Sequence, residues 1–180
     1  MSRRFVACAT LVLVGAWVVG AGAPVAQAAS KLDVCALLPL AEANAIAGQP
    51  LVVNKTPLPK FVTSQKDFLG HCEWSGANPA LLNGTDPPLF LPSVTVLKYS
   101  AAAWKQRITA AKQVGGLSKK VSIAGAAKAV QLIGKCPPQI FDETLVRVGK
   151  RLFDVKVNPY YIQCPPGRSV DFAKVLLSHL

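Results

Sequence analysis

The chain has 180 residues, with 20 Lys and Arg against 9 Asp and Glu and a formal net charge of +11. This length suits one domain with its own hydrophobic core. No run of five or more basic residues occurs and aromatic residues make up only 7% of the chain, which argues against specific recognition of nucleic acid.

The first 28 residues predict a cleavable secretory signal peptide. Arg3 and Arg4 precede an apolar run at 5–19, and glycine and proline then interrupt it. The small residues of 26–28 (AQA) predict cleavage after Ala28, so that the exported domain covers 29–180. The apolar run is shorter than the roughly 20 residues needed to cross a bilayer, so it is not interpreted as a membrane span. Cys8 lies at the wrong end of the run for a lipid attachment.

Four cysteines follow the predicted cleavage site: Cys35, Cys72, Cys136 and Cys164. An even number of cysteines in an exported chain predicts disulfides, and four allow three pairings. We predict Cys35–Cys72 and Cys136–Cys164, because each bridge closes a loop within one half of the domain. No closely spaced Cys or His pair indicates zinc, so the sequence predicts no metal and no other cofactor.

The first half of the exported domain predicts one helix and two strands. Pro39 and Gly48 are typical of the start and end of a helix, and Leu51 to Val53 form a strand-like patch. A strand is predicted at 70–75, where Cys72 and Trp74 share one face and His71 and Glu73 the other.

A turn-rich stretch at 76–92 follows and is predicted to be a long loop. Its apolar residues Leu82, Leu89 and Phe90, with Trp104 farther along, are candidates for the lining of an apolar ligand site. The alternative is that these four residues complete the core beneath the loop.

The second half predicts strands at 93–99 and 129–133, a helix capped by Ser100 that runs through Gln113, and a hairpin at 144–158. The hairpin turns at Gly149-Lys150, and Asp142-Glu143 are interpreted as a polar lead into it. Ser169 is predicted to cap a terminal helix with Ala173, Leu176, Leu177 and Leu180 on its apolar side. The pattern predicts an α+β fold: an antiparallel sheet covered by helices in a disulfide-stapled single domain.

Several short motifs carry a family resemblance: 33–38 (DVCALL) with 41–43 (AEA) and Gly48, then 72–74 (CEW), 123–127 (IAGAA) and Cys164 ahead of the last helix. With these motifs the chain resembles the domain-of-unknown-function 3558 family of secreted proteins and lipoproteins of actinobacteria. The resemblance implies an α+β domain at the cell envelope with no assigned activity. The chain departs from the family's lipoproteins because it lacks a lipobox.

Three functions are weighed. The first is a non-catalytic binding module of the cell envelope whose ligand is small and apolar or amphipathic. The second is a basic interaction protein that docks on anionic cell-wall or membrane polymers, since removal of the signal leaves a net charge of about +9. The third is a secreted hydrolase using His71 and Glu73; it ranks last because no nucleophile or metal-hydrolase motif is present, and no catalytic residue is assigned. The sequence alone assigns no oligomeric state.

Overall fold

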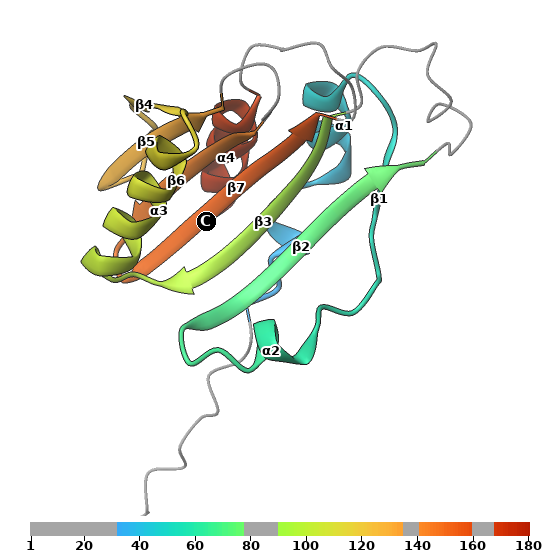
Figure 1. Ribbon diagram of the computed structural model, residues 1–180. Coiled ribbons are helices and arrows are strands. Elements are labelled where there is room, and N and C mark those ends of the chain that lie inside the picture. The colour runs from blue at the N-terminus through green and yellow to red at the C-terminus, as the bar shows by residue number, and fades with distance from the viewer. Residues whose placement is uncertain (1–31, 78–89, 135–140, 160–167) are drawn as a thin grey trace, which may run out of the picture. The chain divides into compact units, whose positions relative to one another are not determined.

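The computed structural model describes residues 32–77, 90–134, 141–159 and 168–180, and only the backbone at 90 and 158–159. All described residues belong to one unit, Lys31–Leu180. Seven strands among them form one antiparallel sheet in the order β1-β2-β3-β7-β6-β5-β4 (Figure 1). Their bounds are β1 Leu51–Val53, β2 Phe68–Gly76, β3 Phe90–Lys98, β4 Leu117–Lys120, β5 Lys128–Ile133, β6 Asp142–Val148 and β7 Arg151–Pro159.

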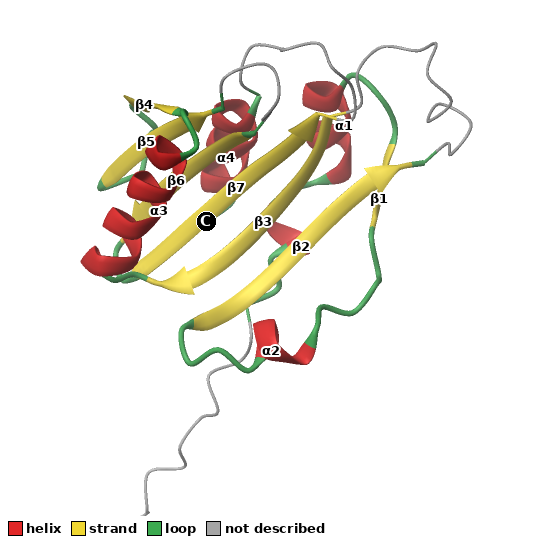
Figure 2. Ribbon diagram, in the orientation of Figure 1, coloured by secondary structure: helices red, strands yellow, loops and turns green. Residues whose placement is uncertain are grey.

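The helices lie on both faces of this sheet (Figure 2). They are η1 (Cys35–Leu37), α1 (Leu40–Ala47), α2 (Lys60–Thr63), α3 (Ala101–Gln113) and α4 (Ser169–Ser178). Helices α1 and α4 pack on one face, which we call the core face, and α3 packs on the other, which we call the α3 face. The predicted α+β fold, with helices covering an antiparallel sheet, is confirmed.

The larger hydrophobic core lies on the core face. Trp74 of β2, Phe153 of β7 and Phe172 of α4 are its largest side chains and are at most 1% exposed. A disulfide joins Cys35 of η1 to Cys72 of β2, as predicted, and Cys72 and Trp74 share the buried face. Cys136 and Cys164 lie outside the described residues.

The β6–β7 hairpin sets which residues reach each face. Val148 pairs with Arg151 across the two-residue Gly149-Lys150 turn, as the sequence predicts, and Gly149 has a positive φ of 56°. Because residues alternate between faces, Val146 and Phe153 enter the core face, while Leu145 and Asp154 lie on the α3 face.

The predicted helix boundaries are confirmed where a terminal residue ends or caps the helix through its own conformation or hydrogen bond. Gly48 ends α1 in the left-handed conformation, and Ser100 caps α3 by accepting a hydrogen bond from the Ala103 N–H at 3.0 Å. The predicted cap at Ser169 is wrong, because Arg168 occupies the N-cap position. The Ser169 hydroxyl is instead directed into the sheet, where it donates to Asp142 Oδ1 at 2.6 Å.

Three elements differ from the sequence-based expectation. The predicted loop 76–92 ends early, because β3 begins at Phe90 and pairs with β7 from there on; 78–89 lie outside the described residues. Helix α2 has only four residues, too few for a periodic pattern. Strand β4 is exposed at every position, so the alternation that identifies a half-buried strand is absent.

Candidate functional site

The α3 face carries a smaller core and several buried polar groups. Trp104 and Ala111 of α3 pack against four buried aliphatic side chains of the sheet, Val130, Leu132, Leu145 and Leu152. Helix α3 covers only part of this face, and the strands β2 and β3 extend beyond it (Figure 1). Candidate binding surfaces are therefore found beside α3.

A groove separates α3 from strands β4 and β5 and encloses about 580 Å³. Its apolar lining comprises Trp104, Ile108, Val121, Ala129 and Val130, and its polar lining Lys112, Ser118, Lys120 and Lys128. Trp104, Ile108 and Lys112 are spaced four residues apart and thus form one stripe along α3. The groove therefore has an apolar wall that ends in lysines.

Trp104 lies at the centre of this arrangement. It is only 4% exposed, and its indole Nε1 is buried with no hydrogen-bond partner among the described residues. The Nζ atom of Lys128 lies 4.8 Å from the centroid of the Trp104 ring, within the range of a cation–π interaction. A buried N–H without an acceptor is costly, so Trp104 retains an unused donor beside the groove.

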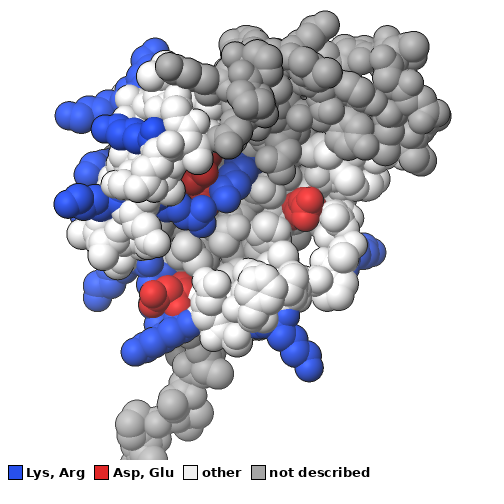
Figure 3. Space-filling view, in the orientation of Figure 1, with Lys and Arg blue, Asp and Glu red and all other residues white. Residues whose placement is uncertain are grey.

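The charged residues that line the groove are all lysines. No Asp or Glu occurs from 87 to 141, whereas this stretch holds eight Lys and Arg. Figure 3 shows basic side chains gathered on the side of the molecule where α3, β4 and β5 lie. Lys112, Lys120 and Lys128 consequently line the groove without a neighbouring acidic residue in sequence, a setting that favours an anionic group.

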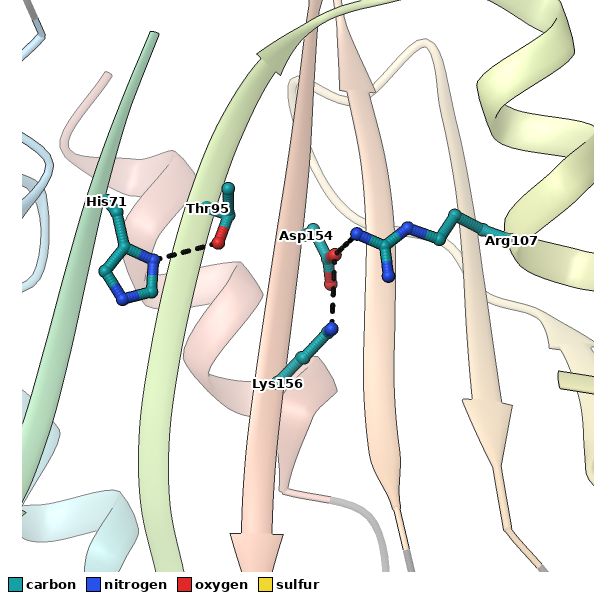
Figure 4. A network of polar contacts seen from close by, with 5 residues as sticks. All are labelled: His71, Thr95, Arg107, Asp154 and Lys156. Atoms are coloured by element: carbon teal, nitrogen blue, oxygen red, sulfur yellow. Dashed lines mark hydrogen bonds and ion pairs between the residues drawn. The ribbon is translucent and has the colours of Figure 1, made fainter. Parts of the chain in front are cut away.

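A network of polar side chains crosses the α3 face next to the groove (Figure 4). Asp154 of β7 is 1% exposed and forms ion pairs with Arg107 of α3 at 3.0 Å and with Lys156 at 3.7 Å. Its carboxylate oxygens have no well-aligned hydrogen bond among the described residues, so charge attraction alone compensates for their burial. The Arg107 contact ties α3 to the sheet within one turn of Trp104.

A second carboxyl group, Glu143 of β6, is close to Asp154. Burial raises the pKa of Glu143 to about 7, and the nearby charge of Asp154 adds to the effect. Glu143 Oε1, like both carboxylate oxygens of Asp154, has no hydrogen-bond partner among the described residues. The interpretation of Glu143 as a polar lead into the hairpin is therefore wrong: β6 begins at Asp142, and Glu143 lies within the sheet.

His71 of β2 lies at the far end of the network. Its Nδ1 is 2.9 Å from the Thr95 hydroxyl, and burial lowers its pKa despite the nearby charge of Glu73. A hydroxyl beside an imidazole can form a nucleophile–base pair, but catalysis of that kind also needs a group that orients the imidazole. Among the described residues His71 Nε2 has no such partner, so the arrangement does not form a triad.

Of the four predicted ligand-lining residues, the structure places one at a groove. Trp104 lines it, Leu82 and Leu89 lie outside the described residues, and Phe90 belongs to β3 with its side chain undescribed. Sequence reasoning missed Lys120 and Lys128, although the acid-free stretch around them was visible in the sequence. It also missed the Arg107–Asp154 pair, which joins residues 47 positions apart.

Comparisons with protein-family models, with curated proteins and with solved structures find no significant match. The resemblance to the domain-of-unknown-function 3558 family stays a prediction. No helix of the described residues is long and apolar enough to cross a membrane. Within the same residues no cluster of three or more His, Cys, Asp or Glu side chains could hold a metal ion.

Proposed function

We propose that this protein is an exported, non-catalytic binding module whose ligand is an anionic amphiphile. The apolar part of the ligand would lie along Trp104 and Ile108, and its acidic head would meet Lys112, Lys120 and Lys128. The observation that carries the proposal is the groove between α3 and β4–β5, which joins an apolar wall to a set of lysines.

The size and chemistry of the groove support a small ligand. Its volume of about 580 Å³ lies within the range of small-molecule sites. An oxygen of the ligand would supply the acceptor that Trp104 Nε1 lacks among the described residues. A purely apolar ligand would satisfy neither this donor nor the lysines, which favours an amphiphile with an acidic group.

The disulfide supports export. Cys35 and Cys72 are bonded, and such bonds persist in oxidising compartments, whereas thiols in the cytosol are kept reduced. Together with the signal peptide predicted at 1–28, this supports a protein that acts at the cell envelope or outside the cell.

Titration of the protein with dodecanoate tests the proposal, with binding measured by tryptophan fluorescence and by calorimetry. We expect saturable binding by the unaltered protein and about tenfold weaker binding by Ile108→Ala, which removes apolar surface from the groove wall. Lys120→Glu should weaken binding about five- to tenfold, because the head group would meet a negative charge.

Lys119→Glu is the matched control. Lys119 and Lys120 are neighbours on β4, yet only Lys120 lines the groove, so both variants change the net charge equally and one changes the site. Equal effects of the two variants would contradict the groove and indicate a general charge effect. Native mass spectra of protein from its own host should show a bound acidic amphiphile that is lost on denaturation.

A further inference from the structure

The corner where α3 ends and β4 begins exposes two aliphatic side chains. Val114, just after α3, is 47% exposed, and Leu117, the first residue of β4, is 62% exposed. Gly115 and Gly116 connect them, and Gly115 has a positive φ of 79°.

This corner is built rigidly. The Gly116 N–H donates to the Ala111 carbonyl at 2.9 Å, and a Cβ atom at Gly116 would lie 2.7 Å from Phe141 Cζ. The turn is therefore packed against the rest of the α3 face and cannot withdraw its two neighbours into the core. Val114 and Leu117 are held at the surface by the conformation of the turn between them.

The charge beside these two residues is positive. Lys112 precedes them on α3 and Lys119 and Lys120 follow on β4, within the stretch that contains no acidic residue. Lysines on an edge strand are typically explained as protection against pairing with another chain. That explanation accounts for Lys119 and Lys120 but not for an exposed leucine on the same short strand.

We propose that this corner, Val114 to Lys120, docks on an anionic lipid bilayer. Val114 and Leu117 would enter the boundary between head groups and acyl chains, and the lysines would lie at the level of the lipid phosphates. The inference rests on the proposed function, because Lys120 belongs both to this corner and to the groove, and Lys112 of the groove precedes the corner by two residues. The groove would thus open at the surface from which an anionic amphiphile is taken or to which it is delivered.

Sedimentation with lipid vesicles tests the docking surface. Purified protein with its Cys35–Cys72 bridge intact is mixed with vesicles of phosphatidylcholine alone or with added phosphatidylglycerol. We expect binding to the anionic vesicles that weakens as salt rises to about 150 mM. The double variant Val114→Ser/Leu117→Ser should bind about tenfold more weakly, since two aliphatic side chains no longer enter the bilayer.

Phe61→Ser is the matched control, because Phe61 is an exposed apolar residue, 73% accessible, on the separate helix α2. It should leave vesicle binding unchanged. The double variant could instead bind anionic vesicles as tightly as the unaltered protein, with binding reduced by salt alone. That result would contradict the docking surface and would indicate a polyanion as the partner.

The dodecanoate titration separates this inference from the proposed function. The double variant should bind dodecanoate as the unaltered protein does, since neither Val114 nor Leu117 lines the groove. A protein that docks on vesicles through Leu117 but does not bind dodecanoate would overturn the proposed ligand and retain the docking surface. If the protein binds dodecanoate and the double variant binds vesicles as tightly as the unaltered protein, the docking surface is overturned and the proposed ligand is retained.

Discussion

Two carboxylates on adjacent strands show how differently the two faces of the sheet are built. Asp142 points to the core face, where it accepts hydrogen bonds from Gln131 Nε2, the Ser169 N–H and the Ser169 hydroxyl at 2.6–2.9 Å. Asp154 points to the α3 face and has two ion pairs but no well-aligned hydrogen bond among the described residues.

We interpret this difference between the two faces as a division of roles: the core face stabilises the fold, and the α3 face binds the ligand. On the core face α1 and α4 cover a large apolar core, and Asp142 ties the start of α4 to β6. On the α3 face one helix covers a small core, and Trp104, whose Nε1 has no acceptor among the described residues, lines a groove there. Unused polar groups are expected where a protein binds something, because a ligand can satisfy them.

The largest expected effect is on the core face. Phe172→Ala should lower the free energy of unfolding by about 3–5 kcal/mol, because Phe172 is fully buried and its removal leaves a cavity. Ile108→Ala on the α3 face should cost less, under about 2 kcal/mol, because Ile108 is only partly buried. Urea denaturation measures both values. A greater loss in Ile108→Ala than in Phe172→Ala would contradict the assignment of stability to the core face.

The disulfide is the next test of the same assignment. Replacing both Cys35 and Cys72 by alanine should lower the free energy of unfolding by about 2–4 kcal/mol, because the bridge closes a loop with a sequence separation of 37. Dodecanoate affinity should be unaffected under conditions where the variant is folded, since the bridge lies on the core face. Weaker binding by the folded variant would show that the two faces are coupled.

The third test concerns Glu143 and depends on pH. Because folding raises its pKa from the usual 4.5 to about 7, the folded protein keeps a proton that the unfolded chain releases. This contribution to stability is complete below pH 4.5 and is lost as the pH rises through about 7, by up to roughly 3 kcal/mol. Glu143→Gln should remove that loss, as measured by urea denaturation across this range.

His71 acts in the opposite direction and must be separated from Glu143. Burial lowers the pKa of His71, so its contribution is present above about 6.5 and is lost as the pH falls below that value. Comparing the unaltered protein with Glu143→Gln cancels the His71 contribution, which both share. A profile that Glu143→Gln does not alter would contradict the buried carboxyl pair.

Local patterns predicted the elements that have local causes. Gly48, Ser100 and the Gly149-Lys150 turn each act within a few residues, and the structure has each of them where the sequence predicts it. The predicted role of Ser169 failed because its hydroxyl is used by Asp142, 27 positions earlier. Of the four candidate lining residues, Trp104 is the one whose side chain belongs to the described residues, and it lines the groove.

The sequence by itself determined the α+β class, the hairpin and the Cys35–Cys72 bridge, because periodicity, turn residues and cysteine spacing act over short distances or constrain few alternatives. Only the tertiary structure decided the order of the strands, the meeting of Arg107 with Asp154 and the position of Lys120 and Lys128 beside Trp104. These contacts depend on which strand pairs with which and on the face where α3 packs. Both are outcomes of burying apolar surface across the whole domain, and no local pattern encodes them.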